Sequence, residues 1–581
     1  MDKSEEKEMG KIQGKKTGRI LIAGSSSGAG KTLFACALMT LLRGHGCEVQ
    51  GYKCGPDFID PMFHSEIAGV PCENLDPFFM TKTQMQNTLK KARGKICVLE
   101  GAMGVYDGIA GAKGIRNGSC YQVACDTQTP ILLLVDAKGM GQTVLSILRG
   151  ILLDDVEGRI AGIVFNRMSK SFFETIRPSA QELLEQMHSS ARIFGFVPHC
   201  REIHLESRYL GLLLPTEIDN LREQAEAFAR QIEEGVDLEL LERIWEESGD
   251  LGLSEQLLEE GADLGQKERI PEDGVELEQS RGNGERPAQT KAPLLAVARD
   301  EAFCFYYHQN IKCLEAAGAN ITFFSPLHDK ELPKGVSGLL LGGGYPELFA
   351  KQLSDNQTMR ESIRKAIESG MPSLAECGGF LYLHEWIEGA SGERFPMVGV
   401  VDGGCKNAGH LVRFGYVRIC GAGGGAEHLL SGISEIRGHE FHYFDSENNG
   451  TDCVAEKPFV PSSWRCMHAG KGHLWGFAHL YYPSAPGLAG AFVARMREYH
   501  PVRAYQFFEN KDCEYYPCHK VIDSLNCLFC YCPFYWREDC PGHPVFKQRG
   551  EKRIKNCSYC TYPHQVEHYD EIRRRLAEMV S

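Results

Sequence analysis

The sequence lacks three features that would each assign it to a class of protein. It has no excess of basic residues, because 63 Lys and Arg stand against 77 Asp and Glu and give a formal net charge of −14. A surface of that sign is not expected to follow the phosphates of a nucleic acid. No apolar run approaches the roughly 20 residues that cross a bilayer, and PILLLV, residues 130–135, has the length of a buried strand. We therefore expect neither a nucleic acid nor a membrane as partner.

The third missing feature is an apolar segment at the N-terminus. Residues 1–17 are charged and lack the apolar core of a secretory signal, so we interpret them as a solvated tail. We expect a cytoplasmic protein in which the 23 cysteines stay reduced. Such cysteines are core residues, metal ligands or catalysts.

Composition divides the 581 residues into several parts, as expected for a chain too long for one core. Short apolar strands alternate with helical patterns over residues 18–245 and again over 293–500, which predicts two α/β domains with parallel sheets covered by helices. Residues 246–292 are acidic, glycine-rich and free of aromatics, and we expect a flexible linker with at most one short helix. Cysteines interleaved with aromatics indicate a small third domain over residues 505–581.

The apolar runs give the expected elements. Those of the first domain are strands at residues 19–24, 47–53, 96–101, 130–137, 160–166 and 193–198. Those of the second domain are strands at residues 294–300, 321–327 and 337–344, a helix over 347–369, and a strand that ends in a sharp turn at PSLAECGG.

A glycine-rich turn, GSSSGAGKT, follows the first expected strand and opens a helix. Such a turn aims backbone N–H groups and the helix N-terminus at an anion. We expect a nucleotide there, with Lys31 on the terminal phosphates and Thr32 on Mg²⁺. The usual template has glycine where Ser25 stands, so this is a variant phosphate loop; a plain Gly/Ser turn is the less favoured alternative. The residues expected to bind the nucleotide are Gly28, Gly30, Lys31 and Thr32.

Acidic residues follow two other expected strands. Glu100 ends one strand, and the carboxyl edge of a parallel sheet is where a ligand and Mg²⁺ bind. Lys53, Asp57 and Asp60 follow another strand. The two aspartates alone would be turn formers, but beside a phosphate loop contact with metal or substrate is favoured. Asp107 is a weaker candidate, because Asp-Gly is first a turn signal.

Cys377 stands between a strand and a helix that opens with two glycines, in the stretch MPSLAECGGFLYL. A strand–turn–helix elbow of this kind exposes a nucleophile. We expect the helix N-terminus to lower the pKa of the thiol. The N–H of Gly378 and a second donor from Gly343 and Gly344 could form an oxyanion hole. His479 is the candidate base, although a lone histidine after an apolar strand is more often a core residue.

The C-terminal cysteines have the spacing of metal ligands. Because so small a domain usually needs a cross-link such as a disulfide or a metal ion, we predict a bound metal, with zinc favoured over an iron–sulfur cluster. The alternative is a reduced domain packed on its aromatics. The candidate ligands are Cys527, Cys530, Cys532, Cys540, Cys557 and Cys560, with Cys518, His519 and His543 as further candidates.

A set of motifs along the chain points to a family. In order they are GPDFIDPMFH, ENLDPF, EGAMGVYDG, VDAKGM, GIVFNRM, ARDEAFCFYY, LGGGYPE, AECGGFLYL and RGHEFHY. Together they resemble the glutamine-dependent cobyrinate a,c-diamide synthases of cobalamin biosynthesis, over residues 18–500. The resemblance implies an ATP-binding domain of the dethiobiotin synthetase type, with a phosphate loop and a parallel sheet. It also implies a flavodoxin-like class I glutamine amidotransferase domain that has a Cys–His pair without the usual triad acid.

The resemblance also implies a chemistry. Cys377 attacks glutamine with His479 as base, ATP converts a corrinoid acetate to an acyl phosphate, and ammonia then forms the amide. Corrinoid, ATP and glutamine are the small-molecule partners, Mg²⁺ is the cofactor, and a homodimer is an assembly left open. The resemblance implies that Asn166 lies at the adenine and that Lys53 binds ATP and neutralises charge during the phosphoryl transfer. It also implies that Asp57, Asp60 and Asp107 lie near the corrinoid or the metal.

Several alternatives stay open. The same chemistry could act on hydrogenobyrinate or on nickel sirohydrochlorin, and cobyric acid synthase shares both domain types with a poorer match of motifs. A nucleotide-binding regulator with an inactive amidotransferase domain is disfavoured by intact Cys377, His479 and Lys31. The tail resembles cysteine-rich small domains attached to corrinoid-pathway enzymes. Docking to a pathway partner or retention of a cobalt corrinoid is a hypothesis for it.

Overall fold

The computed structural model describes residues 18–92, 95–199, 207–208, 211–212, 221–248, 292–389, 391–422, 428–499, 507–519, 525–550 and 552–580. The predicted tail lies outside the described residues, and so does nearly all of the predicted linker with its expected short helix. The chain forms two compact units, of which the first holds Met1–Arg364 and Pro372–Met496 and the second holds Lys365–Met371 and Arg497–Ser581.

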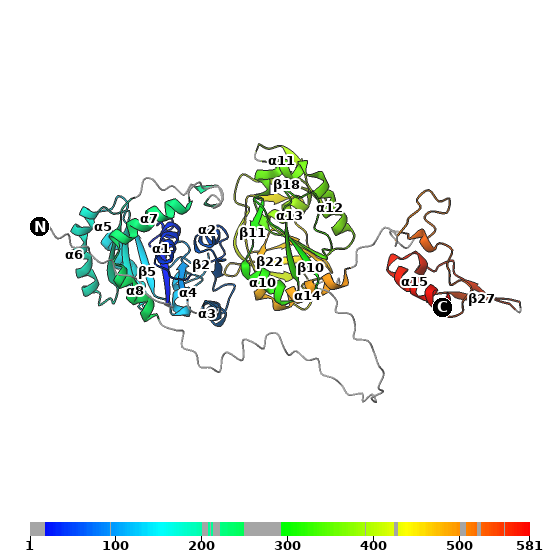
Figure 1. The fold of residues 1–581 in the computed structure, drawn as a ribbon, viewed down its shortest axis with the longest axis horizontal. Coiled ribbons are helices and arrows are strands. Elements are labelled where there is room, and N and C mark those ends of the chain that lie inside the picture. The colour runs from blue at the N-terminus through cyan, green and yellow to red at the C-terminus, as the bar shows by residue number, and fades with distance from the viewer. Residues whose placement is uncertain are drawn as a thin grey trace, which may run out of the picture. The chain divides into compact units, whose positions relative to one another are not determined.

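The first part of unit 1, coloured blue to cyan in Figure 1, is built on a parallel sheet flanked by helices. The sheet has seven strands in the order β3-β2-β4-β1-β5-β6-β7. All six predicted strands are confirmed to within about two residues. The structure adds β3, whose three residues are too few to make a pattern. The strands are β1 (Gly18–Gly24), β2 (Val49–Cys54), β3 (Glu73–Leu75), β4 (Ile96–Glu100), β5 (Ile131–Asp136), β6 (Ile160–Asn166) and β7 (Arg192–Val197).

Helices cover both faces of this sheet, which explains its continuous apolar strands. On β1, Ile20 and Ile22 belong to one core cluster, while Leu21 and Ala23 belong to the other. The first cluster lies under α1 (Lys31–Gly44), α2 (Ile59–Ala68), α7 (Leu221–Gly235) and α8 (Leu238–Glu247). The second lies under α3 (Lys82–Lys90), α4 (Cys120–Thr127), α5 (Thr143–Asp154) and α6 (Lys170–Gln186).

A second sheet follows in the same unit, with strand order β12-β10-β13-β15-β25-β24. Its strands are parallel except for β24, which pairs antiparallel with β25. The predicted strands of this part are confirmed. They are β10 (Leu294–Ala298), β12 (Asn320–Phe324), β13 (Gly338–Leu341), β15 (Ser373–Glu376) and, before His479, β25 (His473–Gly476). The sequence did not predict the edge strand β24 (His468–Ala469).

The helix predicted over residues 347–369 is interrupted. It consists of a 3₁₀ turn, η3 (Pro346–Phe349), then α11 (Ala350–Asp355) and α12 (Gln357–Glu368). Asn356 separates the two helices: its side chain is buried and donates to the carbonyls of Pro326 and Asp329. These hydrogen bonds to a distant segment interrupt the helix at Asn356, and the apolar periodicity of the sequence could not predict them.

Further strands that the sequence did not predict lie between β15 and β25 in the chain, and the short strand β26 follows β25. One sheet has the order β17-β16-β18-β21 and another the order β23-β22-β19-β20-β26. Two of these strands matter for the site, because β26 (His479–Leu480) pairs antiparallel with β20 (Ile436–His442). The others are β16 (His384–Glu388), β17 (Arg394–Pro396), β18 (Val401–Asn407), β19 (Arg413–Gly421), β21 (Phe444–Ser446), β22 (Cys453–Glu456) and β23 (Ser463–Cys466). Short elements complete this part: β11 (Phe303–Phe305), β14 (Gly343–Gly344), α10 (His308–Ala316), α13 (Gly378–Leu383) and α14 (Pro486–Glu498).

Unit 2 has little regular structure. Its described residues include the hairpin of β27 (Val545–Arg549) and β28 (Lys552–Asn556), the 3₁₀ turns η5 (Cys527–Phe529), η6 (Tyr562–His564) and η7 (Val566–His568), and α15 (Tyr569–Val580). Its small core surrounds Phe534, Tyr562 and Ile572. None of the helices described in either unit has the length and apolar character of a membrane span.

Candidate active sites

The phosphate loop lies between the end of β1 and the start of α1, as predicted. Gly28 and Gly30 have φ of +72° and +89°, a region that favours glycine. A Cβ on Gly30 would lie 2.6 Å from Nδ2 of Asn166, at the end of β6. That amide donates to the carbonyl of Ala29 over 2.8 Å, so Asn166 holds the backbone of the loop in place.

Lys31 begins α1 and carries a charge available to an anion. Its Nζ donates to the carbonyl of Ser26 over 3.2 Å, inside the loop itself. Burial lowers the pKa of Lys31, and the nearby Lys53 lowers it further. Both effects disfavour the charged ammonium form of Lys31. The negative charge of a bound phosphate would stabilise that form.

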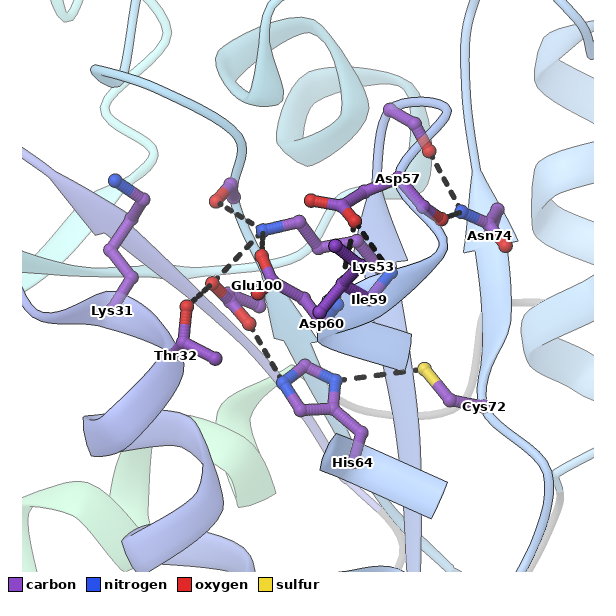
Figure 2. Close-up of polar contacts among 12 residues, drawn as sticks. Lys31, Thr32, Lys53, Asp57, Ile59, Asp60, His64, Cys72, Asn74 and Glu100 are labelled. Carbon is purple, nitrogen blue, oxygen red and sulfur yellow. Dashed lines mark hydrogen bonds and ion pairs between the residues drawn. The ribbon is translucent and has the colours of Figure 1, made fainter. Parts of the chain in front are cut away.

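Glu100, at the end of β4, is the centre of a buried polar cluster (Figure 2). Its Oε1 accepts from Thr32 Oγ1 over 2.7 Å and from Lys53 Nζ over 2.9 Å. Its Oε2 lies 2.7 Å from Nε2 of His64. Burial alone would raise the pKa of Glu100, but Lys53 and His64 outweigh it and hold the pKa well below its usual range. The carboxylate is therefore charged and joins the phosphate loop to β2 and α2.

Asp57 and Asp60 extend this cluster at the start of α2 (Figure 2). Asp60 Oδ2 lies 2.5 Å from Lys53 Nζ, so the lysine joins Asp60 and Glu100. Asp57 Oδ1 accepts from the backbone N–H of Ile59 over 2.8 Å, the contact of a residue that caps a helix start. Asp107 lies in the loop after β4, where Oδ2 accepts from the N–H of Gly104 over 2.7 Å.

His64 is a site residue that the sequence analysis missed. It is fully buried on α2, one turn after Asp60, and its Nδ1 lies 3.6 Å from the Cys72 thiol. The i, i+4 spacing of Asp60 and His64 puts both on one helix face. That spacing was the available signal, but which face meets Glu100 depends on how α2 packs on the sheet.

Cys377 forms the predicted elbow between β15 and α13. Its φ of +46° is rare for a residue with a side chain and marks backbone strain. Its N–H donates to the carbonyl of Gly476 over 2.8 Å, which anchors the elbow to β25. Bulk is excluded behind it, because a Cβ on Gly379 would lie 2.1 Å from the carbonyl oxygen of Leu341.

The structure brings the other predicted groups of this site together. A Cβ on Gly343 would lie 2.2 Å from Cε1 of His479, so the imidazole lies directly against this glycine. A Cβ on Gly378 would lie 3.0 Å from the backbone nitrogen of Gly344. The elbow residue Gly378 and the imidazole of His479 therefore both lie against the short strand β14.

Protonation at this site differs from the prediction. Burial raises the pKa of Cys377 well above its usual range, and Glu347 adds to the effect. The N–H of Gly378 lowers it, but less, so the expected depression by the helix N-terminus was wrong: desolvation exceeds what one turn of helix contributes. Burial also lowers the pKa of His479 to about 3, with His439 and His442 adding to it. The resting pair is a neutral thiol and a neutral imidazole.

His479 has no triad acid among the described residues. It is only 3% exposed, and its Nδ1 has no hydrogen-bond partner in the part of the chain that the structure describes. Its ring lies instead 4.8 Å, between centroids, from that of Phe58, the residue before α2. An aromatic contact thus fixes the ring where a carboxylate would do so in a triad.

The cysteines of unit 2 are divided between two places. Cys532, Cys540, Cys557 and Cys560 pack around the small core of that unit, whereas Cys527 begins the 3₁₀ turn η5 and Cys530 directly follows it. The sequence did not distinguish these places, because Cys527, Cys530 and Cys532 follow one another closely in the chain.

Models of three families match the chain. A CobQ/CobB/MinD/ParA nucleotide binding domain matches residues 20–210. A CobB/CobQ-like glutamine amidotransferase domain matches residues 295–457. A cysteine-rich small domain matches residues 504–581.

Curated relatives match along most of the chain. The cobyrinate a,c-diamide synthase of Caldanaerobacter subterraneus subsp. tengcongensis is 33% identical over 470 residues, which cover 79% of this chain and 94% of the relative. The enzyme of that name from Clostridium acetobutylicum is 32% identical and covers 80% of this chain and 97% of its own length. The one from Clostridium tetani is 36% identical and covers 73% and 86%.

Proposed function

This chain belongs to the cobyrinate a,c-diamide synthase family, and from that premise we propose that it amidates the a- and c-acetate carboxylates of cobyrinate with ATP and glutamine. One observation carries the proposal: a single compact unit holds both a phosphate loop with the buried carboxylate Glu100 and a nucleophile elbow with the buried base His479. The predicted domains divide the work, with residues 18–245 for ATP chemistry and 293–500 for glutamine.

Ammonia is released at the elbow. Cys377 Sγ attacks the side-chain carbonyl carbon of glutamine while His479 takes the thiol proton and passes it to the leaving nitrogen. The N–H groups of Gly378 and of the Gly343–Gly344 segment stabilise the oxyanion. Water then hydrolyses the thioester to glutamate. Because both resting groups are neutral, the proton is transferred only after glutamine binds. The Cys377 thiol therefore reacts little with other electrophiles before that.

The carboxylate is activated at the phosphate loop. An acetate oxygen of the corrinoid attacks the γ-phosphorus of ATP, ADP leaves, and the acyl phosphate then reacts with ammonia to give the amide and phosphate. Such a transfer depends on positioning and on neutralising charge. Lys31 supplies that charge at the loop, Lys53 holds the acidic residues in place, and Asn166 braces the loop near the adenine.

Metal ions are part of the proposal. The hydroxyl of Thr32 and the carboxylates of Glu100 and Asp57 are hard oxygen donors of the kind Mg²⁺ prefers, and Asp60 and Asp107 are close candidates for metal or corrinoid. When bound, Mg²⁺ neutralises charge on the ATP phosphates. The cysteines of unit 2 fit zinc, or an iron–sulfur cluster as the alternative.

His64 is expected to set the affinity for Mg²⁺, because it orients Glu100 through a buried contact of 2.7 Å. His64→Ala should raise the Mg²⁺ concentration for half-maximal activity about 10- to 100-fold. His64→Gln, whose amide NH₂ can occupy the place of Nε2 beside Glu100, should stay close to the parent protein. Mg²⁺ titrations of ATP-dependent amidation with free ammonia measure this, and equal behaviour of the two variants would contradict it.

Phe58 is placed to couple the two reactions. Its ring contacts His479 and lies 4.4 Å from the Tyr307 ring, while the Tyr307 hydroxyl donates to the carbonyl of Pro56 over 3.1 Å. The segment that contains Asp57 therefore contacts the glutaminase base. A nucleotide that moves the start of α2 would thereby reposition His479.

We expect Phe58→Ala to lower glutaminase kcat/KM about 3- to 30-fold and to reduce its stimulation by ATP and corrinoid. Amidation with free ammonia should change much less, because that reaction needs no base at the elbow. Phe323→Ala, at a half-exposed ring on β12, is the matched control. An equal loss with both nitrogen sources would instead indicate general damage.

The substrate assignment is tested by an amidation assay. Purified protein is incubated with Mg-ATP, glutamine and, in parallel, cobyrinate, hydrogenobyrinate or nickel sirohydrochlorin, and mass spectrometry counts carboxylate-to-amide conversions. We expect two conversions on cobyrinate alone. Conversion of another macrocycle would keep the mechanism and change the pathway. Glutamate release without any conversion would overturn the substrate assignment.

The regulator alternative makes the opposite prediction, since an inactive amidotransferase domain releases no glutamate. We also propose that the protein acts in the cytoplasm and forms a homodimer. Light scattering of the purified chain tests the dimer.

A further inference from the structure

Three metal-binding side chains converge in unit 2, apart from both active sites. The Cys518 thiol and one ring nitrogen each of His519 and His564 lie within 4.8 Å of one another. Zn–S and Zn–N bonds put the ligand atoms of a tetrahedral zinc site roughly 3.3–3.6 Å apart. The three side chains are therefore near the positions they would take around one ion.

The surroundings of His564 hold its ring for such a role. The residue is only 4% exposed, and its Nδ1 lies 3.2 Å from the carbonyl oxygen of Asn526. Because a carbonyl only accepts, Nδ1 carries the proton and Nε2 is left with its lone pair. The N–H of Asn526 in turn donates to the carbonyl of His564 over 2.8 Å. A backbone carbonyl on the second nitrogen is the usual support of a metal-bound histidine.

The other two ligands complete the arrangement. The ring of His519 lies 4.6 Å, between centroids, from that of His564. Cys518 is exposed, so an ion can reach the site from solvent. The two rings are tilted against each other at an interplanar angle of 58°, and a shared cation would satisfy a lone pair of each.

We propose that Cys518, His519 and His564 bind a transition-metal ion of the zinc class, with a fourth position open to solvent or to a neighbouring thiolate. Imidazole and thiolate donors suit zinc, and three protein ligands leave a position that structural four-cysteine sites do not have. This site is separate from the cysteines packed around the core of unit 2. It does not depend on the amidation reaction, so failure of one proposal leaves the other intact.

Metal analysis of the full-length chain tests the proposal. The parent protein is purified without chelators and its zinc is measured by mass spectrometry, alongside Cys518→Ser and His564→Asn. Asparagine can keep the hydrogen bond to the Asn526 carbonyl but has no equivalent of Nε2. His568→Ala, at a half-buried histidine of the same unit that lies outside the candidate ligand set, is the matched control. Glutaminase activity of each variant reports that unit 1 is folded.

We expect both ligand variants to lose one zinc ion per chain relative to the parent protein, and His568→Ala to lose none. Because a ligand variant could lose metal by local unfolding, apo protein is also titrated with Co²⁺. The parent chain should give a thiolate-to-cobalt charge-transfer band that Cys518→Ser weakens, and d–d bands that His564→Asn alters. A parent chain without bound metal would overturn the proposal, as would equal zinc content and equal cobalt spectra in the ligand variants and the parent.

Discussion

Cys377→Ala should abolish glutamine-dependent amidation while amidation with free ammonia continues. The rate with glutamine should fall by about 10⁴-fold or more, the size of effect seen when a covalent nucleophile is removed. Only the glutamine reaction needs a thioester, because free ammonia reaches the acyl phosphate without it. Both rates are measured as amide formed on the corrinoid, with glutamate release as the direct assay of the elbow.

The structure supplies a control for this experiment. Cys420 is a half-buried cysteine on β19 of the same part of unit 1, and Cys420→Ala should keep both activities. Loss of the ammonia-dependent reaction in Cys377→Ala would mean that the elbow also supports the phosphate site. Retained glutaminase activity would show that a different residue is the nucleophile.

Lys31→Met is the second change with a large expected effect. In contrast to Cys377→Ala, it should impair amidation and spare the glutaminase reaction. Amidation should fall about 10²- to 10³-fold with either nitrogen source, the usual cost of losing one charge that stabilises a transition state. Among the residues that the structure describes, the Lys31 ammonium donates within its own loop, to the carbonyl of Ser26, so its removal should leave the cluster around Glu100 intact. Basal glutaminase activity without ATP should persist.

ATP-dependent ADP release and glutamate release, measured on the same preparation, separate these outcomes. Lys82→Met, at an exposed lysine that begins α3, is the control and should behave as the parent protein. Full amidation activity in Lys31→Met would contradict the assignment of the phosphate loop. Simultaneous loss of glutaminase would indicate that Lys31 stabilises the whole unit.

Each sequence prediction that held depends on short-range physics. A strand buried on both faces must be apolar throughout, so β1, β5 and β6 were visible as runs of residues. The phosphate loop and the elbow at Cys377 each need glycines at fixed offsets, because their backbones take positive φ or closely approach another segment of the chain. Such requirements involve residues that are close in the sequence, so they can be recognised without knowledge of the tertiary structure.

The failures share a different cause. The pKa of Cys377 was expected to fall, yet its burial against the strands beside it raises it. His64 was missed because its partner Glu100 lies on another strand, and His564 because its partners Cys518 and His519 are distant in the chain. Desolvation and convergence are properties of packing, and no spacing in the sequence encodes them.

The sequence by itself determined the two α/β parts, the phosphate loop, the nucleophile elbow and the cysteine-rich end, since each is a local pattern of apolar runs, glycines or cysteines. The tertiary structure alone decided which side chains meet: His64 with Glu100, Phe58 with His479, and His564 with Cys518. It also decided the charge state of the elbow, because the free energy of an ion depends on how completely the fold removes water around it.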